Sequence, residues 1–139
     1  MTSPAATILI VDDEIPNRKL LETLLRAEGY LTLAAANGEE ALASIAQRAP
    51  DLILLDVLMP GMGGFQVASI LKANPAASSI PIIMVTVQSD RDTRLAGLAA
   101  GAEEFLTKPI DRIELLLRVR NLLRLKTLSN FLENHGSIL

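Results

Sequence analysis

Short apolar runs recur along the sequence, and each is bounded by turn residues and followed by a longer segment with helical spacing. The first run, Ile8 to Val11, is continuous rather than alternating, which is typical of a strand buried on both faces of a sheet. Strands that alternate with helices predict βαβ units, right-handed crossovers and a parallel sheet covered on both faces. The sequence therefore predicts an open, doubly wound α/β fold.

Turn residues and helical spacing set the expected bounds of these elements. Gly29 and Pro50 close the first and second helices, Gly101 caps the fourth, and Asp111 is a favoured residue for the N-cap of the fifth. The first helix is expected to place an apolar face toward the core, made of Ile15, Leu20, Leu21, Leu24, Leu25 and Ala27. The expected strands are residues 8–11, 30–35, 52–55, 82–86 and 104–107, and the expected helices begin near residues 15, 38, 65, 91 and 112.

Composition limits the chemistry that the chain can carry. The 139 residues include no cysteine and one histidine, His135, which excludes disulfides and thiolate zinc sites and argues against a Ser-His-Asp set. A net charge of −3 and an aromatic content of 3% argue against a nucleic-acid surface. Because the chain has neither a signal-peptide pattern nor an apolar run of about 18 residues, we expect a cytoplasmic protein.

Polar residues follow the predicted strands at their carboxyl ends. Asp12 and Asp13 follow the first strand, Asp56 the third and Lys108 the fifth, and Thr86 ends the fourth. In a doubly wound sheet the ligand site lies at this edge. If the strand order is the flavodoxin-like 2-1-3-4-5, these side chains converge on one pocket.

Three neighbouring carboxylates repel one another unless a cation offsets their charge. Oxygen ligands of this kind suit Mg²⁺, with Mn²⁺ as the alternative, and a lysine beside such a metal attracts an anion such as phosphate. One aspartate is then left to act as a nucleophile and form an acyl phosphate. The residues alone predict magnesium-dependent phosphoryl transfer onto an aspartate.

The motifs that carry this site closely resemble the receiver domain of two-component response regulators. The resemblance covers about Thr7 to Leu125, and it implies a disordered tail at residues 1–6, a receiver domain at 7–125, and a helical extension at 126–139 or a linker to an output domain that this sequence does not contain. Its motifs are Val11-Asp12-Asp13-Glu14, Leu54 to Gly64, Val85-Thr86 and Phe105 to Pro109.

The resemblance assigns the metal and phosphoryl ligands residue by residue. Asp56 matches the phospho-acceptor, Asp13 the direct magnesium ligand, and Asp12 a ligand that acts through a bound water. The backbone carbonyl of Leu58 matches the third protein ligand. No further cofactor is implied.

The remaining matched positions belong to the switch. Lys108 matches the residue that bonds the aspartate and then the phosphoryl oxygens, and the peptide before Pro109 is expected to be cis. Thr86 matches the hydroxyl that moves onto the phosphoryl group, and Phe105 the aromatic residue that turns inward when Thr86 moves.

The implied function is a phospho-acceptor signalling receiver, which is not an enzyme because it catalyses only its own phosphorylation and dephosphorylation. A sensor histidine kinase or phosphotransfer protein would donate the phosphoryl group, and the surface of the fourth helix, fifth strand and fifth helix would pass the signal on, with neither nucleic acid nor membrane bound directly. This surface or the C-terminal helix would form a homodimer. The C-terminal helix carries an apolar stripe made of Leu125, Leu128, Phe131 and Leu132. This stripe could instead pack on a following helix or on its own domain.

Three alternative functions make different demands on these residues. A haloacid-dehalogenase-type phosphohydrolase expects an aspartate two residues after the nucleophile, where Leu58 stands. A flavin-binding module needs a phosphate loop after the first strand, where Asp12-Asp13-Glu14 would repel the phosphate. A receiver-fold partner-binding module that works without phosphorylation remains open.

Overall fold

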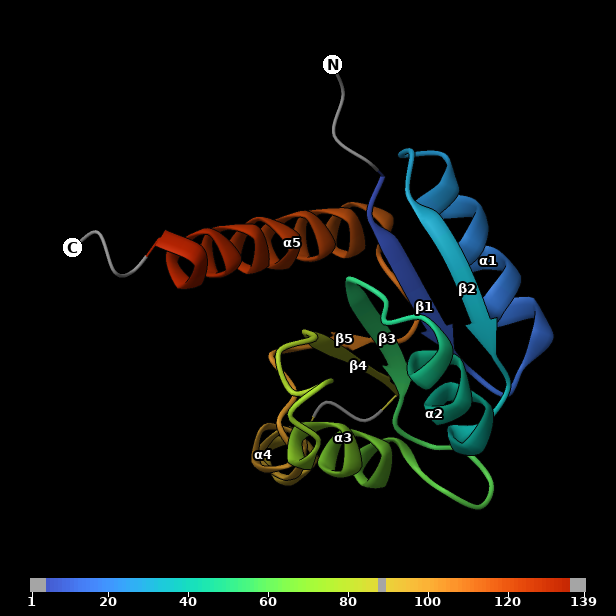
Figure 1. Ribbon diagram of the computed structural model, residues 1–139. Helices are drawn as coiled ribbons and strands as arrows, with labels where there is room; N and C mark the ends of the chain where they lie inside the picture. Colours follow the sequence, from blue (N-terminus) through green and yellow to red (C-terminus); the bar gives the residue numbers. More distant parts are fainter. Residues whose placement is uncertain (1–4, 88–89, 136–139) are drawn as a thin grey trace.

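The protein folds into one five-stranded parallel sheet with helices on both faces (Figure 1). The computed structural model describes residues 5–87 and 90–135. The strand order β2-β1-β3-β4-β5 confirms the predicted flavodoxin-like order. The elements are β1 (Thr7–Val11), α1 (Ile15–Arg26), β2 (Leu31–Ala35), α2 (Gly38–Gln47), β3 (Leu52–Asp56), α3 (Gly64–Ala73), β4 (Ile82–Thr86), α4 (Arg91–Ala100), β5 (Glu104–Thr107) and α5 (Arg112–His135).

The continuous apolar runs are the central strands, and both of their faces are buried. Every residue of β1, β3 and β4 is buried, whereas β2 at the edge of the sheet is half exposed. Alternate strand residues enter two separate cores, because successive side chains point to opposite faces. Helices α2 and α3 cover one core, which includes Leu9, Leu55 and Met84. Helices α1 and α5 cover the other.

Helix α1 buries a narrower face than the sequence analysis predicted. Leu21 and Leu25 are buried, but Ile15 and Leu20 are 56% and 52% exposed, and Ala27 lies beyond the end of the helix and is also exposed. Each helical residue advances by about 100°, so Leu20 lies about 100° from Leu21 and outside the buried stripe. The prediction for Ile15, Leu20 and Ala27 was therefore wrong.

Helix ends agree with the residues that predicted them. Asp111 accepts a hydrogen bond from Glu114 N at 3.0 Å, which confirms it as the cap of α5. Gly101 ends α4 with φ of 106°, in the left-handed region that favours glycine.

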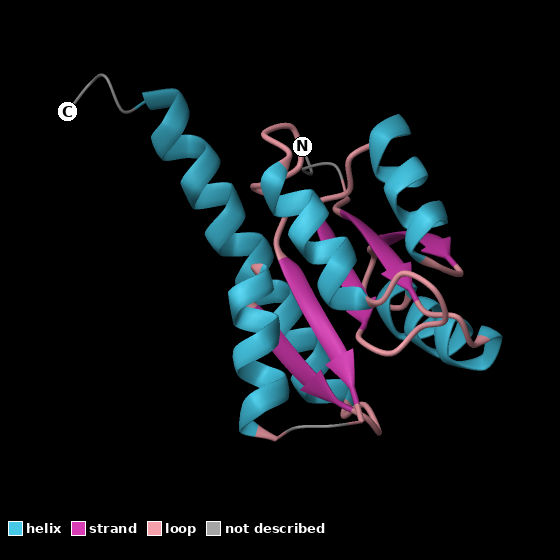
Figure 2. Ribbon diagram, turned by 90° about the horizontal axis from the view of Figure 1, so that it is seen from below, coloured by secondary structure: helices cyan, strands magenta, loops and turns pink. Residues whose placement is uncertain are grey.

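Helix α5 is one continuous helix of 24 residues, and its C-terminal half extends past the sheet (Figures 1 and 2). Lys126 fixes its middle to the start of β3, with Nζ 3.5 Å from the carbonyl oxygen of Asp51 and 3.9 Å from its carboxylate. Among the described helices, none combines the length and apolarity that a membrane span needs. Ala6 O accepts a hydrogen bond from Leu31 N at 2.9 Å, while residues 1–4 of the expected tail lie outside the described part.

Candidate functional site

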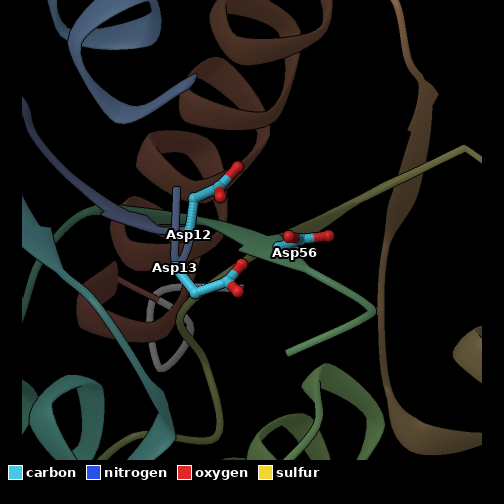
Figure 3. A group of neighbouring side chains, drawn as sticks. All are labelled: Asp12, Asp13 and Asp56. Atoms are coloured by element: carbon cyan, nitrogen blue, oxygen red, sulfur yellow. The ribbon is translucent and has the colours of Figure 1, made fainter. Parts of the chain in front are cut away.

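The carboxyl ends of the strands bring the predicted acidic residues together. Asp12 and Asp13 directly follow β1, and Asp56 ends the adjacent strand β3. One carboxylate oxygen from each residue lies within 4.8 Å of the other two (Figure 3). Backbone hydrogen bonds fix the strand ends, since Asp12 N donates to Ala35 O at 3.1 Å and Val57 N to Val85 O at 3.0 Å. The cluster therefore stands on the rigid sheet.

Lys108 approaches the cluster from the residue after β5. Its Nζ lies 3.4 Å from Asp12 Oδ2 and 3.4 Å from Asp56 Oδ2. Lys108 N donates to Thr86 O at 2.8 Å, and the peptide to Pro109 is cis, as expected. Burial alone would lower the pKa of Lys108, but the carboxylates of Asp56 and Asp12 raise it above its ordinary value. Lys108 is therefore a firmly charged cation at this site.

Asp56 is buried at 5% exposure, and its pKa is raised above the ordinary value. Burial is the main cause, and the neighbouring charge of Asp12 adds to it. The charge of Lys108 and a 3.4 Å hydrogen bond from Leu58 N act in the opposite direction but do not cancel the rise. The charge of Lys108 therefore does not fully offset the cost of burying the Asp56 carboxylate.

Asp12 and Asp13 differ sharply in exposure although they are adjacent. Asp12 is 1% exposed, and its Oδ1 accepts a hydrogen bond from Glu14 N at 2.9 Å. Asp13 is exposed, with its carboxylate in the same cluster as that of Asp56 (Figure 3). The cluster thus has a buried side and a side that solvent can reach.

The donor set fits a hard divalent cation. Three carboxylates with one open side match the oxygen ligands and retained waters that Mg²⁺ prefers. The pKa of the Asp56 carboxyl group is raised, and positive charge added beside it would lower that pKa and favour the ionised form. Asp12, Asp13 and Asp56 are the residues that could hold such an ion.

The predicted switch residues lie beside the cluster. Thr86 is buried at the end of β4, and Phe105 is half-buried on β5 opposite Met84. Thr86 lies two residues beyond Met84, so Thr86 and Phe105 share one face of the sheet. The side chain of Leu58 is 58% exposed at the rim.

Two residues that shape the site were missed by the sequence analysis. The sequence pattern assigned no role to Arg18, yet its Nη1 donates to the carbonyl oxygen of Asp12 at 2.7 Å. Gly64 was named only as the last residue of a sequence motif, but it begins α3 directly against the backbone of Asp56 and Val57. A helix start eight residues after Asp56 is the signal that could have pointed to Gly64.

Comparisons with known proteins agree with this geometry. Residues 8–120 match the family described as the response regulator receiver domain. The chain is 49% identical over 122 residues to the response regulator PleD of Caulobacter vibrioides, covering 88% of this chain and 27% of PleD. It is 44% identical to the phosphate regulon transcriptional regulatory protein PhoB of Pseudomonas aeruginosa, covering 85% of this chain and 52% of PhoB. The chain thus spans about half or less of these relatives.

Solved structures show the same fold. A response regulator from Chloroflexus aurantiacus, described as putative in its own title, superposes with a TM-score of 0.84 at 40% identity, covering 87% of this chain and 99% of that one. The chemotaxis protein CheY4 of Vibrio cholerae gives 0.82 at 33% identity, covering 86% and 99%. With a match over residues 8–120 and this shared architecture, the chain belongs to the receiver domain family of response regulators.

Proposed function

We propose that this receiver domain is a signalling switch that accepts a phosphoryl group on Asp56 from a phosphohistidine of a sensor kinase or phosphotransfer protein. The observation that carries the proposal is the position of Asp56, with Lys108 Nζ 3.4 Å from its Oδ2 and two further aspartates beside it. A haloacid-dehalogenase-type phosphohydrolase would need a further aspartate where Leu58 stands, and the acidic residues Asp12 and Asp13 would repel the phosphate of a flavin.

The reaction would use the ionised carboxylate of Asp56. One oxygen of Asp56 attacks phosphorus, the phosphorus–nitrogen bond to the donor imidazole breaks, and an acyl phosphate forms. Lys108 lies where it can pass from the carboxylate to a phosphoryl oxygen, and the hydroxyl of Thr86 can donate to the same group. Mg²⁺ held by Asp12, Asp13, Asp56 and the carbonyl of Leu58 would supply positive charge for the phosphoryl oxygens.

The output would be a shift in population between two arrangements of the α4-β5-α5 face. A pocket between α4 and α5 marks this face, and its lining includes Arg94, Leu98, Phe105 and Arg118. Arg118 Nη1 donates to Glu104 Oε2 at 2.6 Å, which ties α5 directly to β5. A movement of Thr86 on β4 or of Phe105 on β5 would reach α5 through this contact.

The C-terminal half of α5 is the second proposed contact surface. Its stripe of Leu125, Leu128, Phe131 and Leu132 is 49% to 61% exposed, so about half of each of these side chains stays accessible. A second copy of the chain would bury the stripe.

The relatives that are longer than this chain support control of an output domain or partner. We place the protein in the cytoplasm.

A phosphorylation assay tests the proposal. The protein is incubated with Mg²⁺ and acetyl phosphate, and its intact mass is measured. The wild type and the exposed control Asp92→Asn should each gain one phosphoryl group, whereas Asp56→Asn and the wild type in EDTA should gain none. If the wild type gains no mass under any condition, the alternative of a partner-binding module that works without phosphorylation is favoured.

A further inference from the structure

The side chain of Asp13 depends on its own backbone for its direction. Its carboxylate is exposed, and no hydrogen bond or ion pair joins it to another residue within the described ranges of the chain. Figure 3 shows this carboxylate on the side of Asp56, and the two carboxylates belong to one cluster. A metal site has to hold its ligands in place before the ion binds. The main chain at Asp13 must therefore be held firmly.

The main chain before Asp13 is held on both sides of Asp12. Asp12 N donates to Ala35 O at 3.1 Å, which fixes this residue to the sheet. The carbonyl oxygen of Asp12 accepts a hydrogen bond from Arg18 Nη1 at 2.7 Å. This carbonyl belongs to the peptide group that joins Asp12 to Asp13. Because a peptide group is planar, a bond that holds its oxygen also sets the direction in which the chain enters Asp13.

Arg18 reaches this carbonyl because of its place in α1. It lies in the first turn of the helix, and helical side chains lean toward the N-terminus, which here is the loop that follows β1. Arg18 N also donates to Glu14 O at 3.1 Å, so this turn of the helix is formed. A hydrogen bond from a charged donor is stronger than one between neutral groups. The contact therefore ties α1 to the loop that carries Asp12 and Asp13.

We infer that Arg18 is a positioning residue of the acidic site, which holds the peptide between Asp12 and Asp13 so that the Asp13 carboxylate faces Asp56. The inference rests on the proposed function of these aspartates as Mg²⁺ ligands. The charge of Arg18 acts in the opposite direction, because a guanidinium group near the cluster repels a cation. The hydrogen bond outweighs this repulsion. Arg18→Met should therefore bind Mg²⁺ about tenfold more weakly than the wild type, an effect typical of losing a group that orients a metal ligand.

The first experiment measures Mg²⁺ affinity by titration, followed through the backbone amide resonances of the acidic loop. The proteins are the wild type, Arg18→Met, Arg18→Lys and the control Lys19→Met, which removes the same charge from an exposed neighbouring position. Positioning predicts that the wild type binds most tightly, then Arg18→Lys, which keeps a donor, and then Arg18→Met. Charge alone predicts that Arg18→Met binds more tightly than either.

The control decides whether charge contributes. Lys19→Met should bind Mg²⁺ at least as tightly as the wild type, because it loses a positive charge and no contact with the site. Binding by Arg18→Met that is as tight as that of the wild type or of Arg18→Lys would overturn the inference.

The second experiment separates positioning from a general loss of folding. In metal-free Arg18→Met the carbonyl carbon resonance of Asp12 should move upfield, because the hydrogen bond that deshields it is gone. It should stay in place in Lys19→Met. The resonances of the buried residues Leu25 and Leu71 should be unchanged in both variants. An Asp12 resonance that does not move in Arg18→Met would contradict the contact on which the inference depends.

The wild type separates the inference from the proposed function. Its intact mass after incubation with Mg²⁺ and acetyl phosphate is measured beside the titrations. A wild type that neither binds Mg²⁺ nor gains a phosphoryl group would overturn both. A wild type that does both, with unchanged Mg²⁺ affinity in Arg18→Met, would overturn the inference and leave the proposed function standing.

Discussion

The ammonium nitrogen of Lys108 lies 3.4 Å from a carboxylate oxygen of Asp56, although 52 residues separate the two in the sequence. Even so, the pKa of the Asp56 carboxyl group is raised, because burial outweighs the attraction of Lys108. The charge of Asp56 therefore costs folding stability, which is the usual consequence of an aspartate placed for chemistry rather than for packing.

Asp56→Asn should stabilise the protein in metal-free buffer. With a raised pKa, the folded state binds the proton of Asp56 more tightly than the unfolded state, so this residue lowers stability as pH rises above its unfolded pKa of about 3.9. Urea unfolding in EDTA should give a higher midpoint for Asp56→Asn than for the wild type at pH 7. The difference should shrink toward pH 4. A wild type that is more stable than the variant at pH 7 would contradict the sign of this pKa shift.

Mg²⁺ should stabilise the wild type by binding the folded state. At ten times its dissociation constant a ligand adds about 1.4 kcal/mol to the free energy of unfolding. Asp13→Asn removes an exposed ligand without disturbing the core, so it should reduce this gain. The matched control is Asp92→Asn, which lies on α4 away from the cluster and should respond to Mg²⁺ as the wild type does. Equal stabilisation of the Asp13 and Asp92 variants would place the ion elsewhere.

Gly64→Ala should damage both the fold and the site. A Cβ at Gly64 would overlap the carbonyl oxygen of Asp56 and lie 3.0 Å from Val57 Cα, so α3 or the end of β3 must move. We expect a loss of about 1–3 kcal/mol in unfolding free energy and slower phosphorylation. Gly63→Ala is the control, because its Cβ would meet only Val57 O, at 3.4 Å. Equal behaviour of the two variants would refute this account.

Lys72→Met should be strongly destabilising for a surface lysine. Its Nζ donates to Ser78 O at 3.1 Å, to Ile80 O at 3.0 Å and to Glu103 Oε1 at 2.8 Å, so the substitution leaves two part-buried carbonyl groups without this donor. Such groups cost about 1–3 kcal/mol each. Arg112→Ala breaks an exposed pair with Glu28 at 3.8 Å and should change stability by less than about 1 kcal/mol. Thermal or urea unfolding compares the two.

Self-association through α5 should fail when its stripe is charged. Leu128→Glu combined with Leu132→Glu places charges on a face that a second copy would bury, while both side chains are about half exposed in the single chain. Sedimentation should show a monomer for this variant and a concentration-dependent dimer for the wild type. Asn130→Glu adds a charge to the same helix and should leave the dimer intact. A monomeric wild type at all concentrations would exclude this surface as a dimer contact.

The sheet was predictable because its central strands are buried on both faces and therefore read as unbroken apolar runs. The site followed from one rule, since strand order alone brings Asp12 and Asp56 to the same edge. Leu20 shows where periodicity fails, because an apolar residue beside a buried one is not thereby buried itself. The role of Arg18 was not predictable, since it depends on a side-chain contact that no local pattern contains.

Because α5 is one continuous helix, the direction in which its apolar stripe faces is set by the helical rotation between Lys126 and the stripe. Lys126 is held at Asp51, and no break separates it from the stripe at Leu128 and beyond. Each residue of an α-helix turns the chain by about 100° and advances it by 1.5 Å. Inserting one residue after Lys126 would therefore rotate the stripe by about 100° about the helix axis. Only insertions that add close to a whole number of helical turns would return the stripe to its original direction. The geometry of any assembly that uses this stripe therefore depends on the number of residues between Lys126 and the stripe.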